Sequence, residues 1–334
     1  MPCHWGILGP GFIATRAVIP ALRQVRDARV LAVASRDRER ARETAVQFQI
    51  ERVYDSYQAL LDDPEVQAVY IALPNHLHCE WTLRAAQAGK HVLCEKPLAL
   101  STVECDRMIA ACQQANVLLM EAVMYRFHPR MIALKQMLSS GATGIPRFIH
   151  TAFSFPFNSP DNYRAYPQFG GGALLDVGSY CINAVRWLTG LEPNSAQSIA
   201  SYSQGIDVSI SAMFRFDQND IQKDVQQEGG QKEIVAHIQC SFASAEYQVI
   251  EVVGSEGAVT APLAFTAWRN DTTALHIQRG SQFERLEFAP ADPYQLMASH
   301  FTDCVLEGKP VLYPPEDGRA TIRAVEMVRL SLAR

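Results

Sequence analysis

Short apolar runs alternate with longer amphipathic segments over the first 120 residues of the chain. The apolar runs are typical of parallel strands buried on both faces and lie at residues 5–8, 30–34, 69–73, 91–94 and 118–120. The segments between them have helical spacing and predict helices at residues 12–25, 38–48, 77–88 and 103–114. Pro20 should kink or divide the first helix, because it lacks an N–H donor. This alternation predicts a doubly wound parallel sheet.

The hydrophobic period changes after Pro146. Every second residue is apolar from Ile234 to Phe242, and the same alternation occurs at residues 148–155, 207–216 and 247–253. Such alternation is typical of antiparallel strands with one covered face. Helices are expected again at residues 174–189, 293–306 and 318–332, and the polar residues 217–232 predict an exposed hairpin tip. We therefore predict two domains, residues 1–122 and residues 123–334, with a last helix that can pack back on the first domain.

Composition narrows the class of protein. A chain of 334 residues is too long for one ordinary core, which agrees with two domains. Its net charge of −5 gives no reason to expect nucleic acid or an anionic membrane as a partner. No apolar run reaches the ~18 residues of a membrane span. Eight scattered cysteines suit a reducing compartment better than disulfides or a zinc site, and no export signal precedes the first strand. We expect a cytoplasmic protein without a metal site.

A glycine motif follows the first predicted strand directly. Gly9 permits a tight turn, Gly11 leaves room for a pyrophosphate beside the backbone, and Ala14 lets the next helix lie close to the sheet. The helix start at Phe12 and Ile13 offers free N–H groups and the positive end of the helix dipole. Glycine clusters are often plain turns, but this position between a strand and a helix favours a dinucleotide site.

The end of the second predicted strand indicates which dinucleotide binds. An NAD enzyme needs an acidic residue here for the ribose hydroxyls, but the chain has Ser35, then Arg36 and, one turn later, Arg40. A hydroxyl and two guanidinium groups make a strong site for a 2′-phosphate. We expect Asp37 to turn away toward the helix N-terminus. The sequence predicts NADP as cofactor, with NAD possible if the arginines only cover a helix face.

Further polar residues follow the remaining parallel strands. The carboxyl ends of parallel strands face one crevice, so we expect a cofactor and substrate cleft there. The residues expected on its cofactor side are Leu73, Pro74, Asn75, His78, Glu95 and Lys96. Lys96 leaves a buried strand directly into Pro97, which fixes the backbone and aims the side chain. A solvated surface lysine is the common alternative.

A second glycine-rich segment precedes another predicted helix. The glycines at 170–172 would let a loop approach a ligand. Asp176, Tyr180, Asn183 and Trp187 then form one helical stripe, separate from the apolar stripe of the same helix. A stripe with a carboxylate and a phenol suits the wall of a cleft, and an exposed helix face is the alternative.

These motifs together resemble those of the Gfo/Idh/MocA oxidoreductases, over essentially the whole chain. The most specific matches are residues 5–11, 95–97 and 170–180. The resemblance implies an N-terminal Rossmann domain and a C-terminal α+β domain whose open, mainly antiparallel sheet builds homodimers or larger assemblies. It also implies hydride transfer between NAD(P) and a sugar, polyol or related carbinol. By position, Lys96, Asp176 and Tyr180 match the catalytic trio of the family.

Tyr180 distinguishes the branches of this family. A histidine stands at this position in the inositol dehydrogenase branch, so the chain is more similar to glucose–fructose oxidoreductase, D-xylose dehydrogenase and dimeric dihydrodiol dehydrogenase. Residues 121–129 resemble the last two especially, whereas the long segment 217–232 departs from the pattern. We expect an NADP-dependent enzyme acting on a sugar or vicinal diol. An NAD-dependent inositol-type dehydrogenase and a non-catalytic dinucleotide-sensing regulator are the alternatives.

The expected chemistry gives each site residue a role. Tyr180 would be the general acid/base and Lys96 would hold and polarise the substrate oxygen, although these two roles can be exchanged. Asp176 would anchor Lys96 or a substrate hydroxyl. Arg126 and His78 are secondary candidates for substrate contact.

The second predicted sheet also carries more apolar residues than one covered face needs. Val235, Ile250 and Val252 occupy alternate strand positions. An apolar outer face must be covered, and a symmetric partner is the usual solution. We therefore expect a homodimer or a larger assembly through this sheet.

Overall fold

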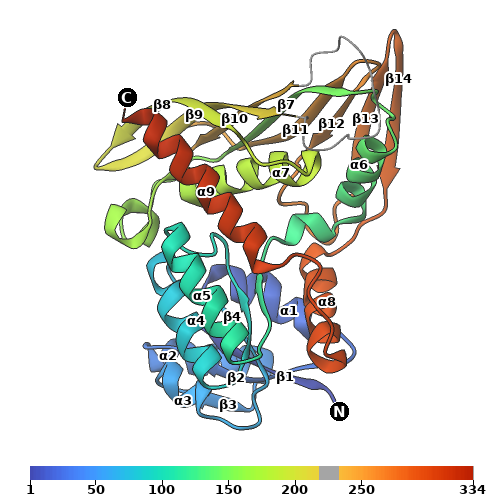
Figure 1. Cartoon of the computed structure of the whole chain (residues 1–334). Coiled ribbons are helices and arrows are strands. Elements are labelled where there is room, and N and C mark those ends of the chain that lie inside the picture. The colour runs from blue at the N-terminus through green and yellow to red at the C-terminus, as the bar shows by residue number, and fades with distance from the viewer. Residues whose placement is uncertain (218–232, 334) are drawn as a thin grey trace. The chain divides into compact units, whose positions relative to one another are not determined.

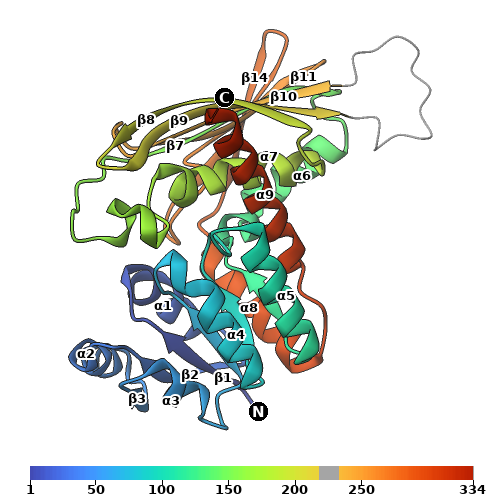
Figure 2. The same cartoon turned by 60° about the vertical axis from the view of Figure 1, so that its left-hand side comes forward.

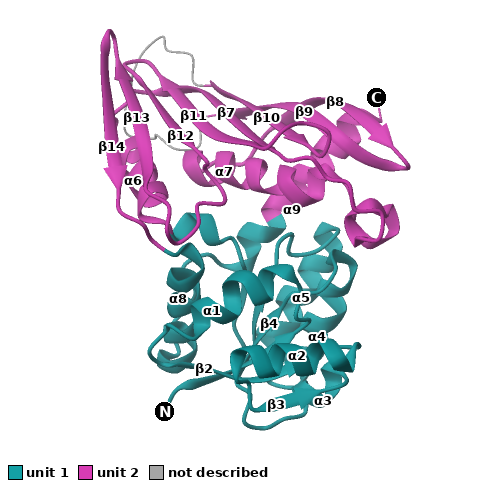
Figure 3. Ribbon diagram, turned by 180° about the vertical axis from the view of Figure 1, so that it is seen from behind, with its two compact units in different colours: residues 1–127, 292–319 teal, residues 128–291, 320–334 magenta. Residues whose placement is uncertain are grey.

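The computed structural model describes residues 1–217 and 233–333 and divides the chain into two compact units. Unit 1 comprises residues 1–127 and 292–319, and unit 2 comprises residues 128–291 and 320–334 (Figure 3). The chain therefore returns to unit 1 at residues 292–319, where the sequence predicted a domain from residue 123 to residue 334 whose last helix can pack back on the first domain. The predicted hairpin tip lies, apart from Asp217, outside the described residues.

Unit 1 is built on a six-stranded parallel sheet with the order β3-β2-β1-β4-β5-β6. Its strands are β1 (Cys3–Leu8), β2 (Ala28–Ala34), β3 (Arg52–Tyr54), β4 (Ala68–Ile71), β5 (His91–Cys94) and β6 (Leu119–Glu121). The strand order reverses between β1 and β4, and ligands of such sheets bind at that point, outside the carboxyl ends of the strands. The predicted Rossmann sheet is confirmed.

The helices of unit 1 lie on both sides of this sheet (Figure 1). Helix α1 packs with α8, while α4 packs with α3 and α5. Their bounds are α1 (Ile19–Leu22), α2 (Arg38–Phe48), α3 (Tyr57–Leu61), α4 (His78–Gln87), α5 (Thr102–Gln114) and α8 (Pro293–Glu307). The first helix is continuous and changes geometry just before Pro20: a π-helical segment, η1 (Ala14–Val18), passes directly into α1, where Pro20 cannot donate to the ladder.

Unit 2 is built on an eight-stranded sheet with the order β14-β13-β12-β11-β7-β10-β9-β8. All neighbours are antiparallel except β7 and β10, so the predicted mainly antiparallel sheet is confirmed. The strands are β7 (Pro146–Ser154), β8 (Ser195–Ser203), β9 (Ile206–Asp217), β10 (Glu233–Ser241), β11 (Tyr247–Gly254), β12 (Ala258–Pro262), β13 (Thr273–Arg279) and β14 (Gln282–Phe288).

Helices cover one face of this sheet (Figure 2). Helix α7 (Ser179–Thr189) packs on β7 and β10, and α6 (Pro129–Ser139) packs on β13. The boundary between the units falls inside α9 (Pro315–Leu332), whose later part meets β8 where Ser198 Oγ donates to the carbonyl of Val328 at 3.1 Å. None of the described helices is long and apolar enough to cross a membrane.

The register of the second sheet corrects one sequence prediction. Ile250 pairs with Thr151 and Val252 pairs with Ile149, and all four residues are fully buried on the helix-covered face. Only Val235, paired with Phe148, lies on the outer face as expected. The alternation in β11 starts one position later than the sequence argument assumed, because a strand's period does not reveal which set of residues faces inward.

All eight cysteines are free and buried. Each lies in a packed strand, helix or helix end, and burial raises the pKa of every one of these thiols. They therefore behave as small hydrophobic residues.

Candidate active site

The glycine turn after β1 has the shape of a dinucleotide cradle. Gly9 has φ +87°, and a Cβ there would lie 2.7 Å from Leu73 Cδ2 and 3.0 Å from the carbonyl oxygen of Ala72. At Gly11 the same Ala72 oxygen, at 3.5 Å, is the one atom within 4 Å of an added Cβ. Gly9 is thus required by the chain itself, whereas Gly11 faces open space that a pyrophosphate can approach. Phe12 next to it is 71% exposed.

Four polar residues follow the carboxyl end of β2, and one of them, Asp37, is engaged as a helix cap. Ser35 is buried, and its Oγ accepts a hydrogen bond from the Asp37 N–H at 3.1 Å. Asp37 is the N-cap of α2, where its carboxylate accepts from the Arg40 N–H at 3.2 Å. Arg36 and Arg40 are exposed at the same corner. The prediction that Asp37 turns toward the helix N-terminus is confirmed, and it leaves this corner to cationic side chains.

His78 joins the loops that follow β4 and β5. Its ring is fully buried, with Nδ1 2.8 Å from the carbonyl oxygen of Pro97 and Nε2 2.8 Å from that of Leu73. Burial lowers the pKa of His78, and the contacts with the two carbonyl oxygens oppose that shift. The sequence placed His78 against cofactor or substrate, but the structure gives it no exposed surface. His78 therefore acts on the site by holding together the loops that follow β4 and β5.

Two buried carboxylates fix the backbone on either side of Lys96. Glu95 accepts from the Tyr70 hydroxyl and from the Lys96 N–H, the latter at 3.2 Å. Glu121 accepts from the Leu98 N–H at 2.7 Å. The Lys96–Pro97 peptide is cis, and the Lys96 side chain is half-buried at the carboxyl end of β5. Glu95 therefore shapes the Lys96 loop through its backbone.

The glycines of the second motif approach the protein's own chain. A Cβ on Gly171 would lie 2.4 Å from the carbonyl oxygen of Arg164, and one on Gly172, at φ +105°, would lie 2.3 Å from Asp207 Oδ1. The sequence argument assigned this close approach to a ligand. The structure assigns it to these two residues, so the glycines serve to seat the helix that follows.

The polar stripe on that helix is buried from Asp176 to Asn183 and half-buried at Trp187, which excludes the alternative of an exposed face. Asp176 lies in the π-helical segment η6 (Leu174–Gly178) and is 4% exposed, and Tyr180 in the first turn of α7 is 7% exposed. Arg164 Nε donates to Asp176 Oδ2 at 2.8 Å. The Tyr180 ring lies 5.5 Å from that of Phe153 and 5.6 Å from that of Phe265.

Arg126 has an internal partner. Its guanidinium is buried in unit 1, forms an ion pair with Asp317, and lies 4.8 Å from the centre of the Tyr313 ring. The sequence offered this residue as a substrate contact. The structure places its charge against a carboxylate 191 positions away in the chain, which no local pattern could reveal.

Sequence reasoning missed Arg164 and Asp207. Asp207 lies at the start of β9 and accepts from the Leu174 N–H at 2.6 Å, so it caps the segment that carries Asp176. Asn162 caps the short turn that holds Arg164, and an asparagine at this position was the one local signal of an ordered turn there. No local signal marks Asp207.

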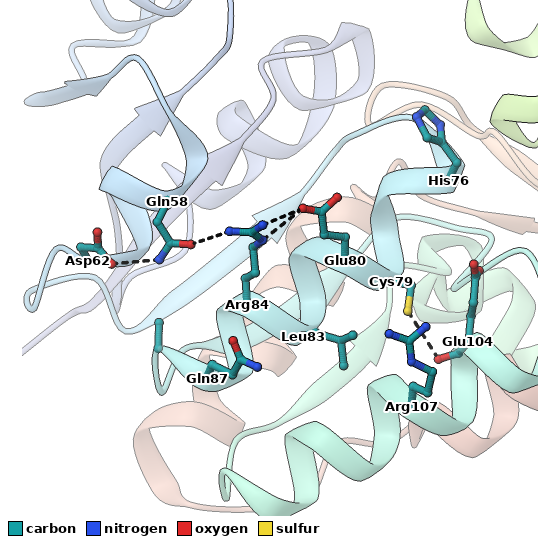
Figure 4. Close-up of a pocket in the computed structure, with 11 residues that line it drawn as sticks. Gln58, Asp62, His76, Cys79, Glu80, Leu83, Arg84, Gln87, Glu104 and Arg107 are labelled. Carbon is teal, nitrogen blue, oxygen red and sulfur yellow. Dashed lines mark hydrogen bonds and ion pairs between the residues drawn. The ribbon is translucent and has the colours of Figure 1, made fainter.

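A separate hollow of about 720 Å³ lies on unit 1 along α4 and α5 (Figure 4). Charged and polar side chains line it: Arg84 forms an ion pair with Glu80 and a hydrogen bond with Gln58, and Gln58 donates to Asp62. His76 lies at its edge. Among the described residues, no group of three or more histidine, cysteine or carboxylate side chains is arranged to hold a metal ion.

Comparison with known proteins gives this site its context. Residues 3–123 match the model of the oxidoreductase family with an NAD-binding Rossmann fold, and residues 131–260 match the GFO/IDH/MocA C-terminal domain. An uncharacterized oxidoreductase of Rhizobium meliloti is 35% identical over 99% of this chain and 97% of its own length. A D-xylose 1-dehydrogenase (NADP(+)) of Haloferax volcanii is 31% identical over 97% of this chain and 95% of its own.

A solved structure agrees with these matches. The crystal structure of a 3-ketoreductase from Actinomadura kijaniata, in complex with NADP and TDP-benzene, superposes with a TM-score of 0.88 and 31% identity. The superposition covers 99% of this chain and 98% of that one. The turn, strand ends and buried stripe described above thus occur within two matched domains of one family. The chain belongs to the Gfo/Idh/MocA oxidoreductases and is a member of the NAD(P)-dependent dehydrogenases and reductases.

Proposed function

We propose that this protein is an NADP-dependent oxidoreductase acting on the CH–OH group of a sugar, polyol or vicinal diol, or on the corresponding carbonyl. The observation that carries the proposal is the burial of Asp176 and Tyr180 on one helical stripe, in the motif that the family uses for chemistry. The family resemblance would make Lys96, which follows β5, the third member of the trio. The xylose dehydrogenase and the ketoreductase among the relatives support a sugar-type substrate.

The nicotinamide, when bound, supplies or accepts the hydride. A hydride leaves a carbinol carbon only as the hydroxyl proton is removed, so a base must lie within hydrogen-bond reach of that oxygen. The pKa of free tyrosine is about 10 and that of free lysine is about 10.4. A nearby cation lowers both pKa values, because it favours the phenolate and opposes the ammonium. We assign Tyr180 as the general acid/base, and Lys96 as the group that holds and polarises the substrate oxygen. Asp176 accepts a hydrogen bond from a neighbouring substrate hydroxyl.

The cofactor preference follows from the corner at the end of β2. Asp37, which follows β2, is held as the cap of α2, and its carboxylate is thereby directed to the helix N-terminus and not to the ribose hydroxyls. Ser35, Arg36 and Arg40 would hold a 2′-phosphate, and Gly9, Gly11 and the η1 helix start would hold the pyrophosphate. Leu73, Pro74 and Asn75 would flank the nicotinamide side, since they follow β4.

A screen of sugars and diols with NADP and NAD tests the proposal. We expect absorbance change at the nicotinamide band with at least one substrate, and a preference for NADP. Tyr180→Phe and Lys96→Met should each depress turnover strongly and leave NADPH binding intact. Binding of NADPH without turnover of any substrate would instead favour a dinucleotide-sensing regulator, and turnover of inositols with NAD would favour the inositol-type enzyme.

We also propose that the second sheet forms a homodimer in the cytoplasm. Exposed apolar side chains stand on its outer face at Phe148, Ile199, Met213 and Tyr247. Ile199 and Tyr247 also line a depression of about 440 Å³ whose other lining residues are mostly serine and alanine, and apolar side chains of a second copy would fit into it. Eight unpaired thiols support a reducing compartment. A strictly monomeric mass at micromolar concentration would contradict the assembly.

A further inference from the structure

The main chain of Arg164 is held within the loop that precedes the helix carrying Asp176 and Tyr180. It lies in a short turn, η4 (Tyr163–Ala165), capped by the side chain of Asn162. Its carbonyl oxygen accepts from the Gly172 N–H at 3.1 Å, and the absent side chain of Gly171 leaves room for that oxygen. The turn and the glycine loop are therefore one folded unit, and the position of Arg164 is fixed relative to the start of η6.

The Arg164 side chain reaches from this turn to the Asp176 carboxylate. Its Nε donates to Asp176 Oδ2 at 2.8 Å, and its guanidinium also lies 3.4 Å from Asn162 Oδ1 and 4.8 Å from the centre of the Tyr163 ring. A planar group held by a carboxylate, an amide and an aromatic ring has one orientation. The direction of the Asp176 side chain is thereby set from outside its own helix.

Asp176 is buried more deeply than Arg164, and its carboxylate therefore depends on their ion pair. The Asp176 side chain is 5% exposed, and that of Arg164 is 28% exposed. A carboxylate removed from water this far needs a charged or hydrogen-bonding partner to stay ionised and in place. Asp207 supports the same segment by accepting a hydrogen bond from the Leu174 N–H.

We propose that Arg164 is a positioning residue that keeps Asp176 ionised and aimed to accept a hydrogen bond from a substrate hydroxyl. This rests on the proposed function, since it assumes that Asp176 meets the substrate. Arg164 acts through Asp176 and contributes little once that carboxylate is gone. The proposal adds a residue outside the catalytic trio to the determinants of substrate affinity.

A double-mutant cycle with Arg164→Gln and Asp176→Asn tests this inference. A misplaced charge-assisted hydrogen bond should lower kcat/KM of the Gln variant about 10- to 100-fold. Most of that loss should appear in the KM for the sugar or diol, with the Kd for NADPH unchanged. In the Asp176→Asn background, Arg164→Gln should lower kcat/KM by less than about twofold. Arg164→Lys keeps the charge and should restore part of the loss, and it also serves if the Gln variant fails to fold.

A matched control comes from Arg285→Gln, which breaks an exposed ion pair with Glu287 in the same unit and should leave kinetics unchanged. Equal losses from Arg164→Gln in both backgrounds, or wild-type kinetics of that variant, would overturn the inference. Calorimetric binding of the sugar separates it from the proposed function. If the wild type binds a sugar without turning it over, the proposed reaction is wrong. The sugar Kd values of the variants then still decide whether Arg164 positions Asp176. If it binds none, both fail.

Discussion

His128 should make the stability of this protein sensitive to mild acid. The residue is 2% exposed at the start of α6, where its Nδ1 accepts from the Arg130 N–H at 3.1 Å. No described residue pairs with its Nε2. Burial, and then the nearby charge of Arg130, lower the pKa of His128 from 6.5 to about 4. The cap geometry agrees with this direction, since only a neutral Nδ1 can accept a hydrogen bond.

The pKa shift fixes the sign and size of the effect. The unfolded chain takes up a proton near pH 6.5 and the folded chain only near pH 4, so the contribution of His128 to stability is intact above pH 6.5 and is lost as the pH falls through this window. At pH 5 the unfolded histidine is protonated and the folded one is still neutral. This pH lies about 1.5 units below the unfolded pKa, which at ~1.36 kcal/mol per unit corresponds to a loss of about 2 kcal/mol.

Urea unfolding at pH 7 and pH 5 measures this loss. Asparagine is a good N-cap and does not titrate, so His128→Asn should lose about 2 kcal/mol less than the wild type between the two pH values. Other histidines with lowered pKa (His78, His91, His237 and His300) add to the loss in both proteins, and the difference isolates His128. His276→Asn, at an exposed position, is the control. Equal pH dependence of wild type and His128→Asn would refute the reasoning.

Four shorter predictions follow from the site and the sheet. Arg36→Ala should reduce the preference for NADP over NAD about 10- to 100-fold in kcat/KM, because a charge-assisted contact to the 2′-phosphate is lost; an unchanged ratio would disprove that contact. Tyr180→Phe should lower kcat by about 10²- to 10⁴-fold at unchanged NADPH affinity, and near-normal turnover would remove Tyr180 as acid/base. Gly172→Ala should destabilise the fold by about 1–3 kcal/mol, measured by urea unfolding, since its φ is +105° and the new Cβ meets Asp207. Met213→Glu should shift the solution mass toward the monomer, and an unaltered mass would move the interface elsewhere.

The first unit could be predicted from the sequence because its structure is determined locally. Parallel strands buried on both faces appear as continuous apolar runs, and α2 began at its predicted residue because Asp37 is a capping residue. The second unit was predicted less well. Strand β8 (Ser195–Ser203) is rich in serine, and β14 (Gln282–Phe288) is exposed on nearly every residue, so neither shows an apolar pattern. Both are strands because a neighbour offers hydrogen bonds, which depends on tertiary structure.

The same distinction applies to the site. Residues at strand ends could be placed from the sequence, because the topology of a parallel sheet brings those ends to one edge. Pairings could not be predicted: Arg126 with Asp317 and Asp207 with the Leu174 N–H join distant segments, and the fold alone decides them. For this reason one predicted substrate contact has an internal partner, and the arginine that binds Asp176 was missed.

The buried thiols have a practical consequence for labelling this protein. Alkylating reagents and maleimides attack the thiolate, and here eight sulfurs are both shielded and held protonated. A single cysteine introduced at an exposed position, such as Val46 in unit 1 or Phe283 in unit 2, would react far ahead of the native ones. Fluorescent or spin probes can therefore be attached to either unit of the otherwise unaltered enzyme, with no cysteine-free background to engineer first.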